Sequence, residues 1–532
     1  MPILDDNDDE RVLKIMKAGD LLHYDYRPGD QQGGGRAKLS DTFRVVQWNI
    51  ERGIKLDAII ADLKALHADF IVLQELDINC RRSNYVNVAK EIAKALEAEI
   101  YFACEFQELD SSLRAPENAV GPYSQPALES ERTSNCEKSE GNTPQPAKGH
   151  HFHGNAILSR RATLRDPTVI PHTSPFMWDE AGDRYKEPRR GFRGALRVRV
   201  DAVDRTSASM APLYIYCCHF EVFCGGLARV RQLADCMADM QRILHSSTTL
   251  WSTRSRQPAF LLAGDLNTMA HGIVRLSRCY GTDRLRWLSL GEVEACWLQR
   301  KVLERNMHCL KAGCCPFSYH FLTRASARVH QFLCNNSLVW QYVYNFTRAE
   351  QDRMSNVDLC LYDPSDKVTS ITLDSPTYYG FARGKLDWIL LSNLQPRPFD
   401  TKRNGAEPID LAALERNGSI LTTSYAARYF HSLYDDGSHD KVCEALVQSD
   451  EAAVTYVPED GYLLFNENYT ASDHRGLVMT VWQNNGRPQD VYPSKGAPYT
   501  TSWAALSFFI LTRTLPVAAV ALGIYRKYKR LG

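Results

Sequence analysis

The chain has 532 residues, of which 44% are hydrophobic and 24% are charged, as in an ordinary globular protein. Its 63 basic residues balance its 63 acidic residues, so no global positive field attracts polyanions. The composition therefore disfavours a nucleic-acid-binding protein, although a local basic groove remains compatible with it.

The first 42 residues are polar and end in GDQQGGGRAKLS, which predicts a flexible N-terminal segment over 1–42. The opening MPILDDNDDE is acidic and lacks an apolar core, so we expect neither a signal peptide nor a mitochondrial presequence. The 15 cysteines are then expected to be reduced in a cytosolic setting. The histidines and cysteines between residues 308 and 320 match no standard zinc spacing, so we do not predict zinc there.

A strand–helix–strand unit follows the N-terminal segment. FRVVQWNI (43–50) predicts a buried strand, KLDAIIADLKALHA (55–68) has helical periodicity, and DFIVLQEL (69–76) predicts a second strand. NVAKEIAKALEA (87–98) predicts another amphipathic helix. Residues 111–150 are rich in Ser, Glu, Asn and Pro, which indicates a disordered insertion.

The middle of the chain returns to strands. HGNAILS (153–159), GALRVRVDA (194–202) and LYIYCCHFEVF (213–223) have strand character. ARVRQLADCMADMQRIL (228–244) predicts a helix, and AFLLAGDLN (259–267) predicts the next strand.

The last part of the predicted domain combines strands with insertions. Residues 277–375 mix helical and irregular sequence, and residues 395–455 form a second, polar insertion. GKLDWILL (384–391) predicts a strand, and HRGLVMTVW (474–482) closes the fold. We find no internal repeat and therefore expect one layered domain over 43–482.

The C-terminal region predicts a membrane anchor. After a linker at 483–502, residues 503–525 are mainly apolar and end against RKYKR; as a helix they would be about 34 Å long, enough to cross a bilayer. Arg513 and Pro516 near the middle leave open an amphipathic helix lying on a membrane or on the domain. We expect a C-terminal anchor with the remaining chain facing the cytosol.

Polar residues gather at the ends of the predicted strands. They are Asn49, Glu75, His219, Asp265, Asn267, Asp387, Asp473 and His474. A single polar residue at a strand end is usually structural, but this many ending on short apolar strands suggest one pocket. Several carboxylates in one pocket repel each other unless a cation joins them, and oxygen-rich ligands suit Mg²⁺ or Mn²⁺.

WNIE, LQEL, GNAILS, HFE, GDLN, LDWIL and SDH, in this order, resemble the motifs of the endonuclease/exonuclease/phosphatase superfamily, which includes deoxyribonuclease I. The resemblance implies an α+β fold, a four-layer α/β/β/α sandwich of two mixed sheets. It also implies a Mg²⁺-dependent hydrolase of phosphate esters.

The resemblance assigns metal binding to three residues. Glu75 is similar to the main metal ligand of the family, supported by Asn49 and Asp473. Glu51 and Asn155 would contact the substrate or support the site, with a surface salt bridge as the alternative for Glu51.

The remaining residues would perform the chemistry. Asp265 would orient or activate the attacking water, and Asn267 would hold the phosphate. His474 would act as general base or transition-state contact, oriented by Asp387, and His219 would hydrogen-bond the phosphate or help the leaving group. If the backbone at 473–474 is extended, the side chains of these neighbours face opposite ways.

Two substrate classes remain open. The expected anchor and the balanced charge favour a membrane-lipid phosphodiester such as sphingomyelin. A DNA or RNA nuclease would need a basic groove, for which EPRRGFRGALRVR (187–199) supplies Arg189, Arg190 and Arg193. A non-catalytic, membrane-tethered binding protein is the alternative from another class.

Overall fold

The computed structural model describes residues 9–28, 42–111, 150–172, 178–181, 188–201, 212–224, 226–248, 258–268, 361–364, 372–374, 383–397, 408–420 and 462–483. The predicted insertions fall largely outside these residues, and so does the predicted linker. The segments 308–320 and 503–525 lie wholly outside them.

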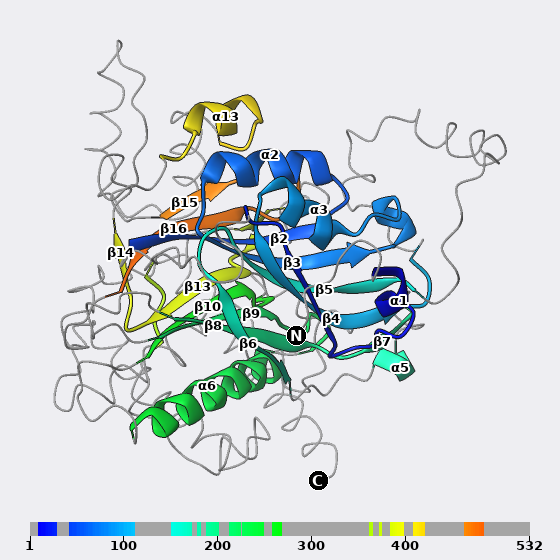
Figure 1. Ribbon diagram of the computed structural model, residues 1–532, viewed down its shortest axis with the longest axis horizontal. Helices are drawn as coiled ribbons and strands as arrows, with labels where there is room; N and C mark the ends of the chain where they lie inside the picture. The colour runs from blue at the N-terminus through cyan, green and yellow to red at the C-terminus, as the bar shows by residue number, and fades with distance from the viewer. Residues whose placement is uncertain are drawn as a thin grey trace, which may run out of the picture.

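Two stacked β-sheets form the centre of the molecule (Figure 1). Sheet A has nine strands in the order β1-β4-β5-β3-β2-β16-β14, with β15 paired to β16 and β7 to β4. Only β2 and β3 run parallel among these pairs. The strands are β1 (Leu21–Asp25), β2 (Thr42–Arg52), β3 (Phe70–Ile78), β4 (Glu99–Glu108), β5 (Phe152–Ser159), β7 (Arg189–Gly191), β14 (Gln395–Arg397), β15 (Tyr462–Phe465) and β16 (Gly476–Trp482).

Sheet B has five strands in the order β13-β10-β9-β8-β6, and its central pair, β9 and β10, is parallel. The strands are β6 (Leu164–Pro171), β8 (Gly194–Val200), β9 (Leu213–His219), β10 (Ala259–Asp265) and β13 (Asp387–Ser392). A separate short pair joins β11 (Leu373–Asp374) to β12 (Arg383–Gly384).

Helices cover the outer faces of both sheets. Helices α2 (Leu56–Leu66) and α3 (Val88–Ala95) pack on sheet A, and α6 (Gly226–Thr248) packs on sheet B (Figure 1). The shorter helices are α1 (Asp9–Leu13), η1 (Arg81–Ser83), α5 (Trp178–Ala181) and α13 (Leu411–Arg416). The predicted four-layer sandwich of two mixed sheets is therefore confirmed.

Alternation along β2 explains how one strand serves two cores. Phe43 and Val45 join the apolar core between the sheets, whereas Val46 and Trp48 join the core beneath α2 and α3. Successive side chains of a strand point to opposite faces. Asn49 shares the parity of Val45, and it therefore points toward sheet B.

The predicted helices at 55–68, 87–98 and 228–244 appear as α2, α3 and α6, and the predicted strands also appear, with shifted ends. One element contradicts the flexibility expected over 1–42. Strand β1 pairs with β4 as the edge of sheet A, and it buries Leu22 and Tyr24 completely. The short run LLHYD was not predicted as a strand because the sequence on both sides of it is polar.

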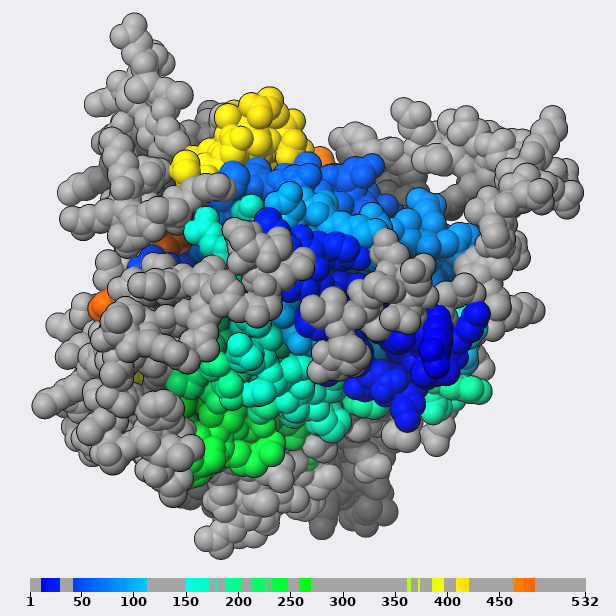
Figure 2. All heavy atoms as spheres, in the orientation of Figure 1, coloured from blue at the N-terminus to red at the C-terminus, as the bar shows by residue number. Residues whose placement is uncertain are grey.

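Helix α13 lies inside the polar insertion predicted at 395–455 and covers α2 (Figure 2). Leu414 is fully buried, and the buried carboxylate of Asp62 accepts hydrogen bonds from Ser419 at 2.7 Å and Asn417 at 2.9 Å. These contacts hold 408–420 against the helix layer. This part of the insertion is consequently packed, unlike the loosely ordered segment expected.

Within the part of the chain that the structure describes, no helix is both long enough and apolar enough to cross a membrane.

Candidate active site

Three predicted site residues occupy one row across sheet B. Asp265, the last residue of β10, is in register with His219 on β9 and with Asp387 on β13. Cross-strand neighbours on one face lie about 5 Å apart, so the three side chains form a single surface. Gly264 permits the close strand approach, because a Cβ there would lie 1.9 Å from the carbonyl oxygen of Cys218.

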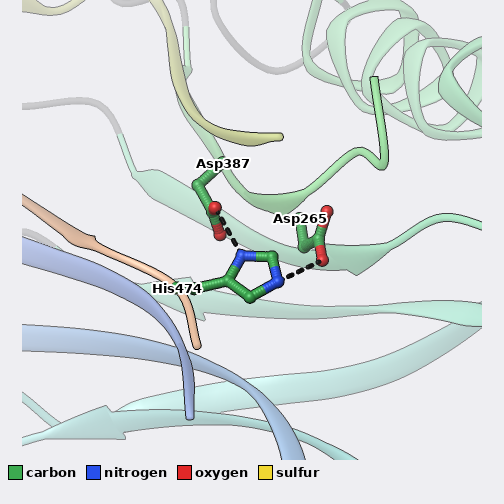
Figure 3. A group of neighbouring side chains, drawn as sticks. All are labelled: Asp265, Asp387 and His474. Carbon is green, nitrogen blue, oxygen red and sulfur yellow. Dashed lines mark hydrogen bonds and ion pairs between the residues drawn. The ribbon is translucent and has the colours of Figure 1, made fainter. Parts of the chain in front are cut away.

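His474 completes this row from the opposite sheet (Figure 3). Its Nδ1 lies 2.8 Å from Asp387 Oδ2, and its Nε2 lies 3.8 Å from Asp265 Oδ2. Asp473 and His474 lie in a bend, because β16 begins only at Gly476. The assumption of extended backbone at this pair is therefore wrong, although the predicted orientation of His474 by Asp387 is present.

The bend that carries His474 is tied to sheet A by residues absent from the predicted site. Ser472 Oγ donates to the carbonyl of Asn49 at 2.7 Å, and Trp48 Nε1 donates to the carbonyl of His474 at 3.0 Å. Asn466 Nδ2 donates to the same His474 carbonyl at 2.6 Å. The ordered motifs contained Ser472 and Trp48, but only the fold shows what they hold.

The electrostatic environment shifts the pKa values of both Asp265 and His474 upward and determines which of them carries the proton. Burial, reinforced by the charge of Asp387, raises the pKa of Asp265 to about 7. Burial alone would lower the pKa of His474, but the carboxylate of Asp387, with Asp473 and Asp265, outweighs it and raises that pKa well above its ordinary value. His474 is therefore the proton-carrying member of the pair.

Asp387 is itself fixed by two further polar side chains. Gln47 Nε2 reaches across from sheet A to donate to Asp387 Oδ1 at 2.8 Å, and it also donates to Gln74 Oε1 at 2.8 Å. Thr372 Oγ1 accepts from the backbone N–H of Asp387 at 3.1 Å. Sequence reasoning missed Gln47 and Thr372, since a lone buried amide or hydroxyl carries no distinctive pattern.

Two β-bulges aim the residues of sheet A into the site. The register of β2 against β3 shifts between Asn49 and Arg52, and that of β3 against β5 shifts between Leu73 and Leu76. Glu75, inside the second bulge, has a left-handed φ of 59°. Asn49 Nδ2 then donates to Asp265 Oδ2 at 3.0 Å and lies 3.4 Å from Glu75 Oε1. The two sheets thus meet at these side chains.

Glu75 is ionised in this setting. Burial would raise the pKa of its carboxyl, but the Arg52 guanidinium, 3.5 Å from Glu75 Oε2, lowers it well below the ordinary value. His219 Nε2 lies 3.9 Å from Glu75 Oε1 and 3.6 Å from Asp265 Oδ2. Glu75, Asp265 and His219 therefore border the same small region.

Glu51 is buried next to this region rather than exposed in a surface salt bridge. Only 1% of its surface is accessible, and neither carboxylate oxygen has a hydrogen-bond partner. Burial, followed by the charge of Asp473, raises the pKa of Glu51 to about 8. A buried carboxylate without a partner is costly, so this group is suited to a bound cation.

The two remaining amides serve the backbone around the site. Asn267, with a left-handed φ of 50°, donates through Nδ2 to the carbonyl of Phe220 at 2.8 Å, and its N–H donates to Asp265 Oδ1 at 2.8 Å. Asn155 Oδ1 accepts from the Glu75 N–H at 3.4 Å, while its buried Nδ2 has no partner. Both amides lie against predicted site residues.

Two of the three arginines that a basic groove would use are buried. Arg189 and Arg193 are buried, with side-chain exposures of 5%, and they face Glu108 and Glu105 respectively. Arg190 alone among the three is exposed. The candidate basic groove at 187–199 is therefore not supported, because two of the three arginines named for it are buried and face acidic side chains.

Asp265, Asp387 and His474 form the compact group of metal-ligand residue types among the described residues, with one ligand atom from each within 4.8 Å of the others. The short His474–Asp387 contact already occupies Nδ1, so we assign this trio to proton transfer. Glu51, Glu75, Asn49 and Asp473 offer a separate set of oxygen ligands, the type that Mg²⁺ prefers.

The solved structures that are similar to this chain include three described next. The human Nocturnin catalytic domain with bound sulfate is 12% identical, with 84% of this chain and 96% of that chain covered and a TM-score of 0.32. An endonuclease/exonuclease/phosphatase from Beutenbergia cavernae is 12% identical, with 83% and 72% covered and a TM-score of 0.31. Truncated Caenorhabditis elegans TDP2 is 12% identical, with 83% and 97% covered and a TM-score of 0.32.

None of the curated proteins matches the sequence. The sequence model of the endonuclease/exonuclease/phosphatase family, in contrast, matches residues 46–474, most of the chain. That range begins just before Asn49 and ends on His474, so it contains every predicted site residue. The chain therefore belongs to the endonuclease/exonuclease/phosphatase family.

Proposed function

We propose that this member of a phosphoesterase family is a Mg²⁺-dependent phosphodiester hydrolase. One observation carries the proposal: Asp265 Oδ2 lies 3.8 Å from Nε2 of the His474 imidazole and accepts a hydrogen bond from Asn49 Nδ2 at 3.0 Å. Residues from both sheets thus surround one carboxylate at the end of a buried strand. Positioned acids and imidazoles of this kind support attack by water on phosphorus.

The residues present fit a divalent cation. Glu51 has two buried carboxylate oxygens without partners, and Glu75 is ionised beside Asn49. Asp473 is close enough to raise the pKa of Glu51. These four residues would hold the ion, with Mn²⁺ as a possible substitute for Mg²⁺. When bound, such an ion neutralises the negative charge that develops on the phosphate oxygens.

The other residues act on the proton and the phosphate. Asp387 holds the imidazole of His474 through Nδ1, so Nε2 points to Asp265 and the space beside it. A water bound between Asp265 and His474 would be oriented by the Asp265 carboxylate and lose its proton to it, while the protonated imidazole of His474 would contact the negative charge that develops on the phosphate. Asn267 stabilises the Asp265 carboxylate through its own N–H, and we propose that its side chain contacts the phosphate.

For the substrate we favour a membrane-lipid phosphodiester such as sphingomyelin over nucleic acid. The net charge of zero and the burial of Arg189 and Arg193 support this choice, because a nuclease gains most of its affinity from phosphate-binding cations. We also propose that residues 503–525 anchor the protein with its catalytic domain facing the cytosol. Deletion of 500–532 would then move the protein from the membrane to the soluble fraction.

A substrate panel tests the proposal. Full-length protein with Mg²⁺ is incubated with sphingomyelin, phosphoinositides, RNA, single- and double-stranded DNA and a nitrophenyl phosphodiester, with EDTA as the control. We expect EDTA-sensitive cleavage that is fastest on sphingomyelin. Fastest cleavage of RNA or DNA would favour the nuclease instead. No cleavage of any substrate would favour the non-catalytic binding protein.

A further inference from the structure

Arg193 is a buried arginine that connects the predicted site to the strands behind it. It lies between β7 and β8, and its NH1 lies 2.7 Å from Glu105 Oε2 and 2.8 Å from His219 Nδ1. Its guanidinium lies 5.0 Å from the centre of the Phe106 ring, and its Nε lies 4.0 Å from Glu221 Oε2. This residue is therefore held in place by acidic and aromatic neighbours, not by solvent.

The contact with His219 determines which ring nitrogen carries the proton. An arginine side chain has only N–H donors, accepts no hydrogen bond and remains charged. Nδ1 of His219 must therefore be the acceptor, and it carries no hydrogen. A neutral imidazole without a proton on Nδ1 has it on Nε2.

Nε2 is the nitrogen that faces the reacting region. It lies 3.6 Å from Asp265 Oδ2 and 3.9 Å from Glu75 Oε1, and both distances exceed a direct hydrogen bond. A phosphate oxygen of the substrate could therefore take this donor without breaking an existing bond. Because His219 is only 2% exposed, such a hydrogen bond would form away from bulk water.

The two histidines of the site have partners of opposite charge. Nδ1 of His474 faces the carboxylate of Asp387 at 2.8 Å, an arrangement that stabilises the protonated ring. Nδ1 of His219 faces a guanidinium at the same distance, an arrangement that stabilises the neutral ring. The first arrangement suits a group that carries a proton, and the second suits a permanent neutral donor.

We propose that Arg193 is a positioning residue that fixes His219 in its Nε2–H form, so that His219 donates a hydrogen bond to the substrate phosphate and transfers no proton to the leaving group. This inference rests on the proposed function, because it specifies what His219 does during phosphodiester hydrolysis. It decides between the two roles that the sequence left open for His219.

A pair of amide substitutions separates the two roles. The side-chain nitrogen of Gln can occupy the place of Nε2, whereas that of Asn corresponds to Nδ1. Neither amide can supply a proton as an acid. We expect His219→Gln to keep kcat within about tenfold of wild type, and His219→Asn and His219→Ala to lose about 100-fold, the usual size of one lost transition-state donor. Equal losses in all three variants would overturn the donor role.

A second measurement needs no turnover. Nitrogen-15 NMR of the full-length protein labelled at histidine reports which ring nitrogen bears hydrogen, with the His219 signals assigned by their loss in His219→Gln. We expect a single Nε2–H form in wild type and a mixture of both neutral forms in Arg193→Met. Arg189→Met is the matched control, since it removes a buried guanidinium that faces Glu108, and it should leave the His219 signals unchanged.

The role of Arg193 and the proposed hydrolase function can fail separately. A wild-type His219 protonated on Nδ1, or identical His219 signals in wild type and Arg193→Met, would overturn the role of Arg193 even if hydrolysis is observed. A wild-type protein with the expected Nε2–H form but no cleavage of any substrate would overturn the proposed function instead.

Discussion

Three site residues other than glycine adopt left-handed backbone conformations: Glu51 with φ 46°, Glu75 with φ 59° and Asn267 with φ 50°. Such conformations are uncommon for residues with side chains and cost free energy unless the surrounding structure imposes them. Here they turn a carboxylate or an amide out of the regular strand alternation and into the site. The strain therefore has a function at the level of single residues.

The Asp387–His474 pair predicts a non-additive loss of activity. Asp387→Asn removes the carboxylate that orients and charges the imidazole, and His474→Ala removes the imidazole itself. We expect each variant to lower kcat by about 100-fold to 10,000-fold, as for other general acid–base groups. The double variant should be no slower than His474→Ala, because the two side chains act as one unit. Losses that multiply in steady-state kinetics would show that the residues act independently.

The raised pKa of Glu51 predicts how the free energy of unfolding of the metal-free protein depends on pH. Its pKa is about 4.3 in the unfolded chain and about 8 in the folded protein, so the folded state prefers the neutral acid. The contribution of Glu51 to stability is fully present below pH 4.3 and is lost as pH rises toward 8. In EDTA at pH 8, Glu51→Gln should therefore be more stable than wild type by at least about 1 kcal/mol.

Mg²⁺ should reverse this order in the same denaturant titrations. Wild type gains stability from an ion that binds only the folded state, whereas Glu51→Gln should gain little. If EDTA and Mg²⁺ give the same difference between the two proteins, Glu51 does not hold the ion.

At the scale of elements, apolar runs predicted the strands well. FLLAGD and VVQWN carry buried residues at every position, and the structure places each inside a sheet, between two partner strands. The bulges at 49–52 and 73–76 were not predictable, because a bulge is a relation between two paired strands. Likewise, nothing in the sequence indicated that Arg193 would face His219, since the two lie on separate strands.

Because β9 and β10 lie so close together, adding one methyl group at Gly264 should strongly destabilise the fold. In Gly264→Ala, the new Cβ would meet the Cys218 carbonyl oxygen at 1.9 Å, so the strands must separate beside His219 and Asp265. We expect a loss of more than about 3 kcal/mol in the free energy of unfolding. Gly194→Ala in the same sheet is the control, since its nearest contact would be 3.1 Å and its loss should be much smaller. Equal melting temperatures for the two variants would contradict this packing.

At the scale of the whole molecule, the order of motifs along the chain predicted the two-sheet architecture and the residues that meet in the site. The described parts of the insertions were harder to predict. Helix α13 is short and lies in polar sequence, and it is held by tertiary contacts with Asp62 that local propensity does not report. Strand β1 was missed for the same reason.

The convergence of both sheets on a metal-dependent site is most directly tested by Mg²⁺-dependent turnover of a nitrophenyl phosphodiester by the full-length protein. Glu75→Gln keeps the shape of the side chain but removes the charge from the bulge of β3. Glu91→Gln, on the outside of α3 with a side chain 46% exposed, is the matched control. We predict that Glu75→Gln lowers kcat/KM by at least about 100-fold, with an unchanged melting profile and wild-type activity in Glu91→Gln. Wild-type turnover in Glu75→Gln, or turnover that persists in EDTA, would contradict the account.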